Sequence, residues 1–266
     1  MTTFISAGDS FTYGNDLSDC LGDGLGNHSM HSWAALTAKN LNMEYVCTAK
    51  PGGSNSSIAR RCLYNVEQSL KQNKKVVVGV MWTYIHRLEI HPKINIQNKK
   101  FRLDDYSTVS GHHSLSFEEK MKNFGLEMND NRVEFFKFSH KTDELAGAGE
   151  ISRCNLKFMS DVLYLIESLK SLLLLKYYLE SNNINYFFIK ASDDINIDNT
   201  YGDPYCEAFK QIADSANWLS IPNFYTWAKN NNFKIGFANH PLEEAHQAYA
   251  EQFIIPYVKP IMNVES

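Results

Sequence analysis

The most constraining feature of this sequence is the run Val76-Val77-Val78-Gly79-Val80-Met81. A continuous run of β-branched residues has no polar face, so it predicts a strand that is covered on both sides, as in a parallel sheet. Residues 4–7, 44–47 and 185–189 are shorter apolar segments, and we expect strands there as well.

Helical segments separate these strands. They are expected at 32–40, from a cap at Ser54 or Asn55 to about 72, at 161–179, and from Pro241 to about 255. Strands that alternate with helices predict an α/β fold, a three-layer α/β/α sandwich around a central parallel sheet. The alternation fails at about 91–150, which we expect to be an insertion folded against the carboxyl edge of the sheet within a single domain, 1–266.

Composition limits the partners and the compartment. The 26 basic and 30 acidic side chains give a net charge of −4, so no nucleic-acid footprint is expected. The five cysteines are odd in number and form no CxxC pair, which is typical of a reducing compartment. The amino terminus lacks signal-peptide character, and charges interrupt the apolar segment 161–179. We expect a soluble cytoplasmic protein with no membrane contact; the sequence does not indicate its oligomeric state.

The segment Gly8-Asp9-Ser10 directly follows the first expected strand. A serine at such a turn presents its hydroxyl above the carboxyl end of the sheet, where ligands bind in open α/β folds. Its backbone N–H points into the same space and favours developing negative charge there. The same three residues also suit a simple turn in which Asp9 caps a short helix.

Two later segments complete a pattern. Pro51-Gly52-Gly53-Ser54-Asn55 follows the second strand, and Asn239-His240-Pro241 lies near the carboxyl terminus. In this order the three segments resemble the SGNH (GDSL-type) hydrolase family. The resemblance implies the flavodoxin-like fold of that family, Ser10 as nucleophile and oxyanion N–H donor, Gly53 as a second donor, and His240 as general base. Pro241 is expected to restrain His240 to an extended conformation in the loop above the sheet.

The sequence departs from the family pattern in two places. The acid that the family places two or three residues before the histidine is replaced by Phe237 and Ala238. The Gly-x-Asn-Asp block after the third strand is also missing, so Thr83 or Asn55 is the candidate for the third oxyanion donor. Arg87 is a candidate for binding an anionic substrate, with a salt bridge to Glu89 or another neighbour as the simpler interpretation.

Other histidines carry no comparable pattern. His246 falls on the apolar stripe of the last helix and is interpreted as a structural residue. His112 and His113 lack the spaced partners of a metal site, and no dinucleotide or phosphate-binding motif follows a strand. We therefore expect no metal and no cofactor.

The predicted function is that of a serine esterase or deacylase that acts through an acyl-enzyme on a small-molecule or glycan ester. Phe11, Tyr13, Trp82 and Tyr84 lie near the expected site and favour a carbohydrate O-acyl ester. Two alternatives stay open: a catalytically degenerate binding protein of the same fold, which the missing acid and the missing asparagine of the Gly-x-Asn-Asp block favour, and an O-acyltransferase.

Overall fold

The central sheet has four parallel strands in the order β2-β1-β3-β6. The computed structural model describes residues 1–20, 27–90, 107–109, 160–236 and 238–263. The strands are β1 (Thr3–Ala7), β2 (Glu44–Cys47), β3 (Val76–Trp82) and β6 (Asn185–Lys190). Every residue of β3 is buried, as its apolar run predicts, because both faces of the sheet are covered.

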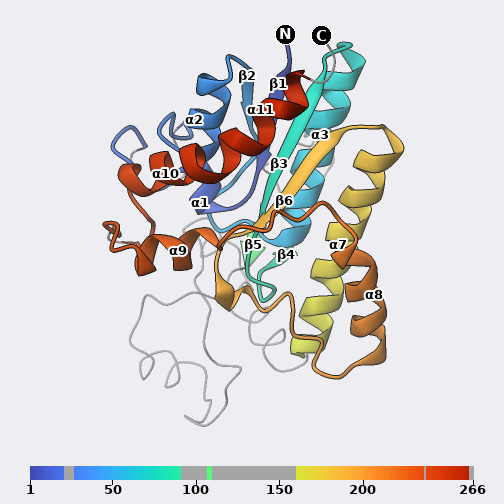
Figure 1. Ribbon diagram of the computed structural model, residues 1–266. Helices are drawn as coiled ribbons and strands as arrows, with labels where there is room; N and C mark the ends of the chain where they lie inside the picture. Colours follow the sequence, from blue (N-terminus) through green and yellow to red (C-terminus); the bar gives the residue numbers. More distant parts are fainter. Residues whose placement is uncertain (21–26, 91–106, 110–159, 237, 264–266) are drawn as a thin grey trace, which may run out of the picture.

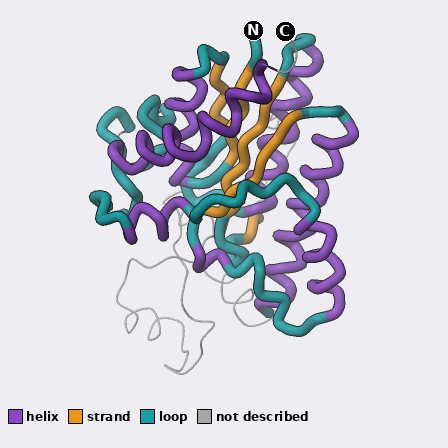
Figure 2. Tube along the Cα trace, viewed as in Figure 1, coloured by secondary structure: helices purple, strands orange, loops and turns teal. Residues whose placement is uncertain are grey.

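Helices cover both faces of this sheet (Figures 1 and 2). One face carries α2 (Trp33–Asn40), α10 (Glu243–Tyr249) and α11 (Ile255–Asn263). The other carries α3 (Asn55–Lys71) and α7 (Asp161–Ser181), with α8 (Pro204–Asp214) packed on α7. The predicted three-layer α/β/α sandwich with a central parallel sheet is confirmed.

The strand order creates a switch point between β1 and β3. From the carboxyl end of β1 the chain goes to β2 on one side, and from the carboxyl end of β3 it goes on to β6 on the other side, so the connections diverge between β1 and β3. Ligands of open α/β sheets bind at such a switch point. Ser10 follows β1 and Thr83 follows β3, so both lie at this edge.

The last helical region differs from the prediction. Its first helix, α10, begins at Glu243 with Leu242 as N-cap, two residues after the expected start at Pro241. Pro241 instead forms an isolated antiparallel bridge with Ile235, so it belongs to the loop that precedes the helix. The region also extends beyond 255, through a π-helical turn at Ala250–Ile254 and then α11 to Asn263.

The segment after β6 holds helices that the sequence analysis did not predict, α8 and α9 (Phe224–Asn230). The predicted insertion at about 91–150 lies outside the described residues, except for β5 (Ser107–Val109), which pairs antiparallel with β4 (Leu88–Ile90). Its role and the single-domain organisation stay predictions. Among the helices that the structure describes, none has both the length and the apolar character that a bilayer span needs.

Candidate active site

The turn after β1 holds Ser10 at the start of a very short helix, α1 (Ser10–Tyr13). Asp9 is its N-cap, and one carboxylate oxygen, Oδ1, accepts from the Phe11 N–H at 3.0 Å. Gly14 ends the helix in a left-handed conformation. The capping interpretation of Gly8-Asp9-Ser10 is therefore correct, and it is compatible with a functional serine because the cap uses only the aspartate.

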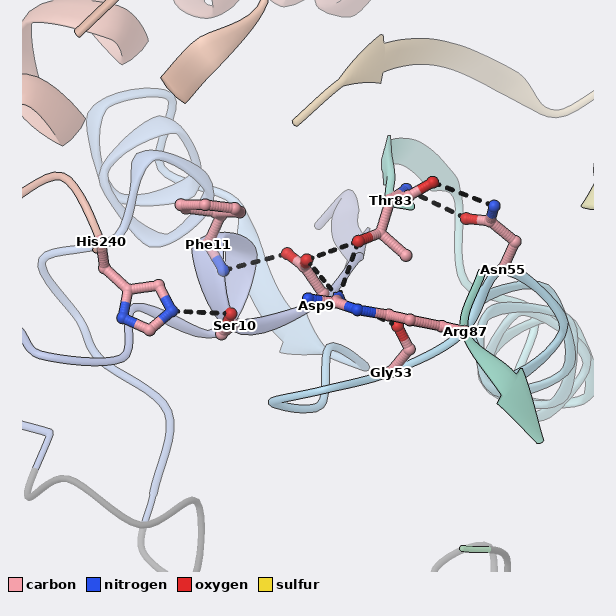
Figure 3. Close-up of polar contacts among 8 residues, drawn as sticks. All are labelled: Asp9, Ser10, Phe11, Gly53, Asn55, Thr83, Arg87 and His240. Carbon is pink, nitrogen blue, oxygen red and sulfur yellow. Dashed lines mark hydrogen bonds and ion pairs between the residues drawn. The ribbon is translucent and has the colours of Figure 1, made fainter. Parts of the chain in front are cut away.

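Ser10 and His240 meet at the carboxyl edge of the sheet. His240 Nε2 lies 2.8 Å from Ser10 Oγ, although the two residues are 230 positions apart in sequence. The Phe11 ring packs on the His240 imidazole in an edge-to-face arrangement, with the ring centroids 5.3 Å apart (Figure 3). Both polar residues are largely buried, with 7% of Ser10 and 8% of His240 exposed, so water has little access to their hydrogen bond.

The other imidazole nitrogen contacts Asp16, a residue that the sequence analysis missed. Asp16 Oδ2 lies 2.9 Å from His240 Nδ1 and also accepts from the Ala238 N–H at 2.9 Å. Because a carboxylate accepts hydrogen bonds, this contact places the imidazole proton on Nδ1 and leaves Nε2 to accept from Ser10. Ser10, His240 and Asp16 together form what we call the triad.

The position of Asp16 explains why the sequence pattern did not reveal it. The family pattern places the acid two or three residues before the histidine, where Ala238 and Phe237 stand, but here it comes from the loop after α1. A signal was present, since an aspartate six positions after the candidate nucleophile, beyond a helix-ending glycine, must lie near the same sheet edge. Asp16 has a positive φ of 70°, which an aspartate adopts more readily than most residues.

Two further contacts fix the loop that carries Asp16. Glu243, at the start of α10, accepts from the Ser18 N–H at 2.6 Å. Gly236 lies directly against the carboxylate: a Cβ there would be 3.0 Å from Asp16 Oδ2 and 3.1 Å from Asp16 Cβ. The loop after α1 and the segment that carries His240 are thus held together at several points.

A second buried network lies beside Ser10 and surrounds the other carboxylate oxygen of Asp9, Oδ2. It accepts from Thr83 Oγ1 at 2.7 Å and from Arg87 Nη1 at 2.6 Å. The partner of the predicted Arg87 salt bridge is therefore Asp9. The Arg87 side chain is only 3% exposed and the Asp9 side chain is fully buried, and the pair lies beside Ser10, on the side away from His240 (Figure 3).

Asn55 binds the backbone of Thr83 with both ends of its amide. Its Oδ1 accepts from the Thr83 N–H at 3.0 Å, and its Nδ2 donates to Thr83 O at 3.0 Å and to Ser168 Oγ at 3.1 Å. The amide N–H groups of Asn55 and the hydroxyl of Thr83 thus have protein partners. An oxyanion role for either residue stays a prediction, because the donor would have to leave its present protein partner to bind the oxyanion.

The turn between β2 and α3 uses the N–H of Gly53. It donates to Lys50 O at 2.9 Å, with Pro51 and Gly52 between them and Gly52 at a φ of 70°. This is the arrangement of a type II turn, which requires glycine at the third position. Among the residues that the structure describes, the Gly52 N–H has no acceptor. An oxyanion role for Gly53 stays a prediction and would require the turn hydrogen bond to open, whereas the Gly52 N–H needs no such change.

His246 is placed as a structural residue. It is fully buried, and its Nδ1 accepts from the Trp33 N–H at 3.0 Å, which connects α10 to the start of α2. Burial lowers the pKa of His246 to about 3, because the charged imidazolium would lose its hydration. Near neutral pH the ring is therefore uncharged.

Comparison with known proteins gives structural matches only. No protein-family model and no curated protein matches the sequence. The structure is similar to a putative lipolytic protein of the G-D-S-L family from Desulfitobacterium hafniense, with 13% identity, a TM-score of 0.42, and coverage of 94% of this chain and 97% of that one.

Two carbohydrate esterases also match. The acetyl xylan esterase Est2A from Butyrivibrio proteoclasticus has 13% identity and a TM-score of 0.44, over 98% of this chain and 64% of that one. A family two carbohydrate esterase from Clostridium thermocellum, solved with cellohexaose, has 14% identity and a TM-score of 0.47, over 98% and 65%. This chain spans about two thirds of the length of these esterases. Similarity at this level concerns the fold and does not indicate an activity.

Proposed function

We propose that this protein is a serine-dependent ester hydrolase in which Ser10 is the nucleophile and His240 the general base. The observation that supports this most is the triad, in which His240 lies 2.8 Å from Ser10 Oγ and 2.9 Å from Asp16 Oδ2. A neutral imidazole so oriented accepts the serine proton, and the carboxylate stabilises the imidazolium that forms.

The proposed reaction has two steps. Ser10 Oγ attacks the ester carbonyl carbon while its proton passes to His240 Nε2, and the tetrahedral intermediate expels the alcohol, which takes that proton. Water then attacks the acyl-enzyme, again losing a proton to His240, and the carboxylic acid leaves as Ser10 regains its proton. Asp16 acts through His240 and does not itself take the proton.

The carbonyl oxygen becomes negative in each step and requires N–H donors. Among the described residues, neither the Ser10 N–H nor the Gly52 N–H in the neighbouring turn has a hydrogen-bond acceptor. We propose these two groups as the oxyanion donors, and Gly52 takes the place that the motif resemblance gave to Gly53.

The substrate class is proposed only as an ester, with a carbohydrate O-acyl ester as one candidate. Phe11, Tyr13 and Trp82 are at most 8% exposed, so these rings do not offer a face on which a sugar could stack. Tyr84 is half-buried, and the Arg87 guanidinium lies 5.0 Å from the centroid of its ring. The burial of three of the four aromatic side chains does not favour a sugar ester over other esters. The absence of an acid just before His240 favoured the non-catalytic alternative. Asp16 supplies a carboxylate to His240 in its place, which favours an enzyme over a pure binding protein.

The first experiment is hydrolysis of 4-nitrophenyl acetate by the wild type and by Ser10→Ala. We expect turnover by the wild type and loss of at least about 10³-fold in the variant, as for removal of a serine nucleophile. Ser215→Ala, at the exposed end of α8, is the matched control and should retain full activity. Equal rates for the wild type and Ser10→Ala would refute the proposed function.

A further inference from the structure

Arg87 has no direct part in the mechanism above, yet it is buried beside the nucleophile. Its Nη1 atom contacts three acceptors: Asp9 Oδ2 at 2.6 Å, Thr83 Oγ1 at 2.7 Å and Gly53 O at 3.3 Å. Only 5% of the residue is exposed, so its contacts are with protein rather than solvent. Figure 3 shows the guanidinium between the Asp9 carboxylate and the Gly53 carbonyl.

These contacts connect the two segments that carry the proposed oxyanion donors. Asp9 immediately precedes Ser10, and its Oδ1 also holds the Phe11 N–H at 3.0 Å. Gly53 follows Gly52 in the turn between β2 and α3, and its carbonyl accepts from Arg87. One nitrogen atom of the guanidinium therefore sets the separation between the nucleophile turn and the Gly52–Gly53 turn.

The charge of Arg87 has a second consequence. The Asp9 side chain is completely buried and adjoins the residue at which negative charge develops during catalysis. Burying an unpaired carboxylate there would carry a large desolvation penalty, and its charge would repel an oxyanion. The Arg87 guanidinium balances this charge with a short hydrogen bond to Asp9 Oδ2.

We propose that Arg87 is a positioning residue that fixes the Ser10 N–H and the Gly52 N–H in the spacing an oxyanion needs, acting through Asp9 and Gly53. This inference rests on the proposed function. It also accounts for the loss of the family's Gly-x-Asn-Asp block, because Thr83 and Arg87 occupy that part of the chain and bind the nucleophile turn instead.

The test compares Arg87→Met, Arg87→Lys and the neutral double variant Asp9→Asn with Arg87→Met. We expect kcat for 4-nitrophenyl acetate to fall about 10²-fold in Arg87→Met, the usual effect of losing one oxyanion interaction, while KM changes less than about threefold. Arg87→Lys keeps the charge but lacks the planar geometry, so it should be intermediate. The double variant removes the unbalanced charge without restoring the contact to Gly53, and should stay at least about tenfold below the wild type.

Lys176→Met is the matched control. Lys176 is a second buried cation, with 6% of its side chain exposed and an ion pair to Glu180 at 2.8 Å, and it lies on α7 outside the proposed machinery. Its substitution should lower stability without changing kcat of the folded protein. A double variant that recovers wild-type kcat would overturn the proposal, because charge balance alone would then explain Arg87.

Hydrogen exchange supplies a readout that does not require an active enzyme. In Arg87→Met, and not in Lys176→Met, the hydrogen-bonded amides of Phe11, Tyr13, Lys50 and Gly53 should exchange faster together, by about tenfold or more, since both turns lose one shared contact. Unchanged exchange in both turns would also overturn the proposal. The proposed function fails on a different result, namely equal hydrolysis by the wild type and Ser10→Ala.

Discussion

Asp16 Oδ2 lies 2.9 Å from Nδ1 of His240, across 224 positions of sequence. The carboxylate that orients the candidate general base therefore comes from the loop that follows the nucleophile, and not from the segment that carries the histidine. Both nitrogen atoms of the ring are engaged, one by Asp16 and the other by Ser10.

Replacing Asp16 by asparagine should lower kcat strongly. An amide can donate to Nδ1, which favours the wrong tautomer, and in serine proteases the equivalent change lowers turnover about 10⁴-fold. We expect a loss of roughly 10²- to 10⁴-fold in kcat for 4-nitrophenyl acetate with little change in KM. Asp19→Asn is the control, because Asp19 accepts from Ser29 Oγ and the Met30 N–H in the same loop and does not contact His240. An equal loss of kcat in both variants would mean that Asp16 only anchors the loop and does not orient His240.

The space beside Gly236 gives a second prediction. In Gly236→Ala the new methyl group would lie 3.0 Å from Asp16 Oδ2 and 3.0 Å from Leu242 Cδ2, so the carboxylate must move. Displacement of the acid weakens its hydrogen bond to His240, and kcat should fall about tenfold or more. Circular dichroism and thermal unfolding would establish that the variant is folded. Wild-type kcat in a folded variant would show that the acid's position is not critical.

Glu243 is expected to hold Asp16 in place indirectly, through the loop that carries it. Its carboxylate accepts from the Ser18 N–H at 2.6 Å, two residues after Asp16, and this contact is lost in Glu243→Ala. We expect a modest decrease in kcat, roughly threefold to tenfold, as the Asp16 loop gains freedom. Glu243→Gln keeps an acceptor and should restore most of it. The adjacent, exposed Glu244→Ala is the control; if it has the same effect, the Ser18 contact is not responsible.

The buried His246 predicts how stability depends on pH. Its pKa is about 3 in the folded protein and 6.5 in an unfolded chain, so below pH 6.5 only the unfolded state takes up this proton. The free energy of unfolding should therefore decrease from pH 6.5 toward about pH 4, by at most about 1.4 kcal/mol per pH unit from this group.

Denaturant titrations of His246→Asn across this pH range check that prediction. Asparagine supplies an acceptor for the Trp33 N–H but does not titrate, so the variant should be less stable than the wild type near neutral pH and lose less stability on acidification. Parallel curves for the two proteins would mean that His246 is not the titrating group.

The sheet could be predicted from sequence because local pattern determines it. The apolar run of β3 can be buried only between two layers, and Ser54 caps α3 by accepting from the Ser57 N–H at 3.2 Å, one of the two caps predicted. The end of the loop before α10 could not be predicted in this way. Pro241 suits a first helical position, but its bridge to Ile235 depends on how the loop between these two residues folds back.

The site was only partly predictable for a related reason. Ser10 and His240 stand in recognisable segments, and the structure brings them within hydrogen-bond distance. The pairs Asp16–His240 and Asp9–Arg87 are tertiary contacts between residues 224 and 78 positions apart. The sequence places Asp16 near the nucleophile but does not identify His240 as its partner. The motif also pointed to Gly53, whose N–H is used by the turn. Whether a peptide N–H is free depends on turn geometry rather than on residue type.

In the proposed mechanism the triad makes Ser10 nucleophilic. The most direct measurement is covalent labelling with a fluorophosphonate probe, followed by mass spectrometry to locate the modified residue. We expect a single adduct at Ser10 in the wild type, labelling at least about 10²-fold slower in Asp16→Asn and His240→Ala, and none in Ser10→Ala. Absence of labelling in the folded wild type, or equal labelling of Ser10→Ala, would contradict this mechanism.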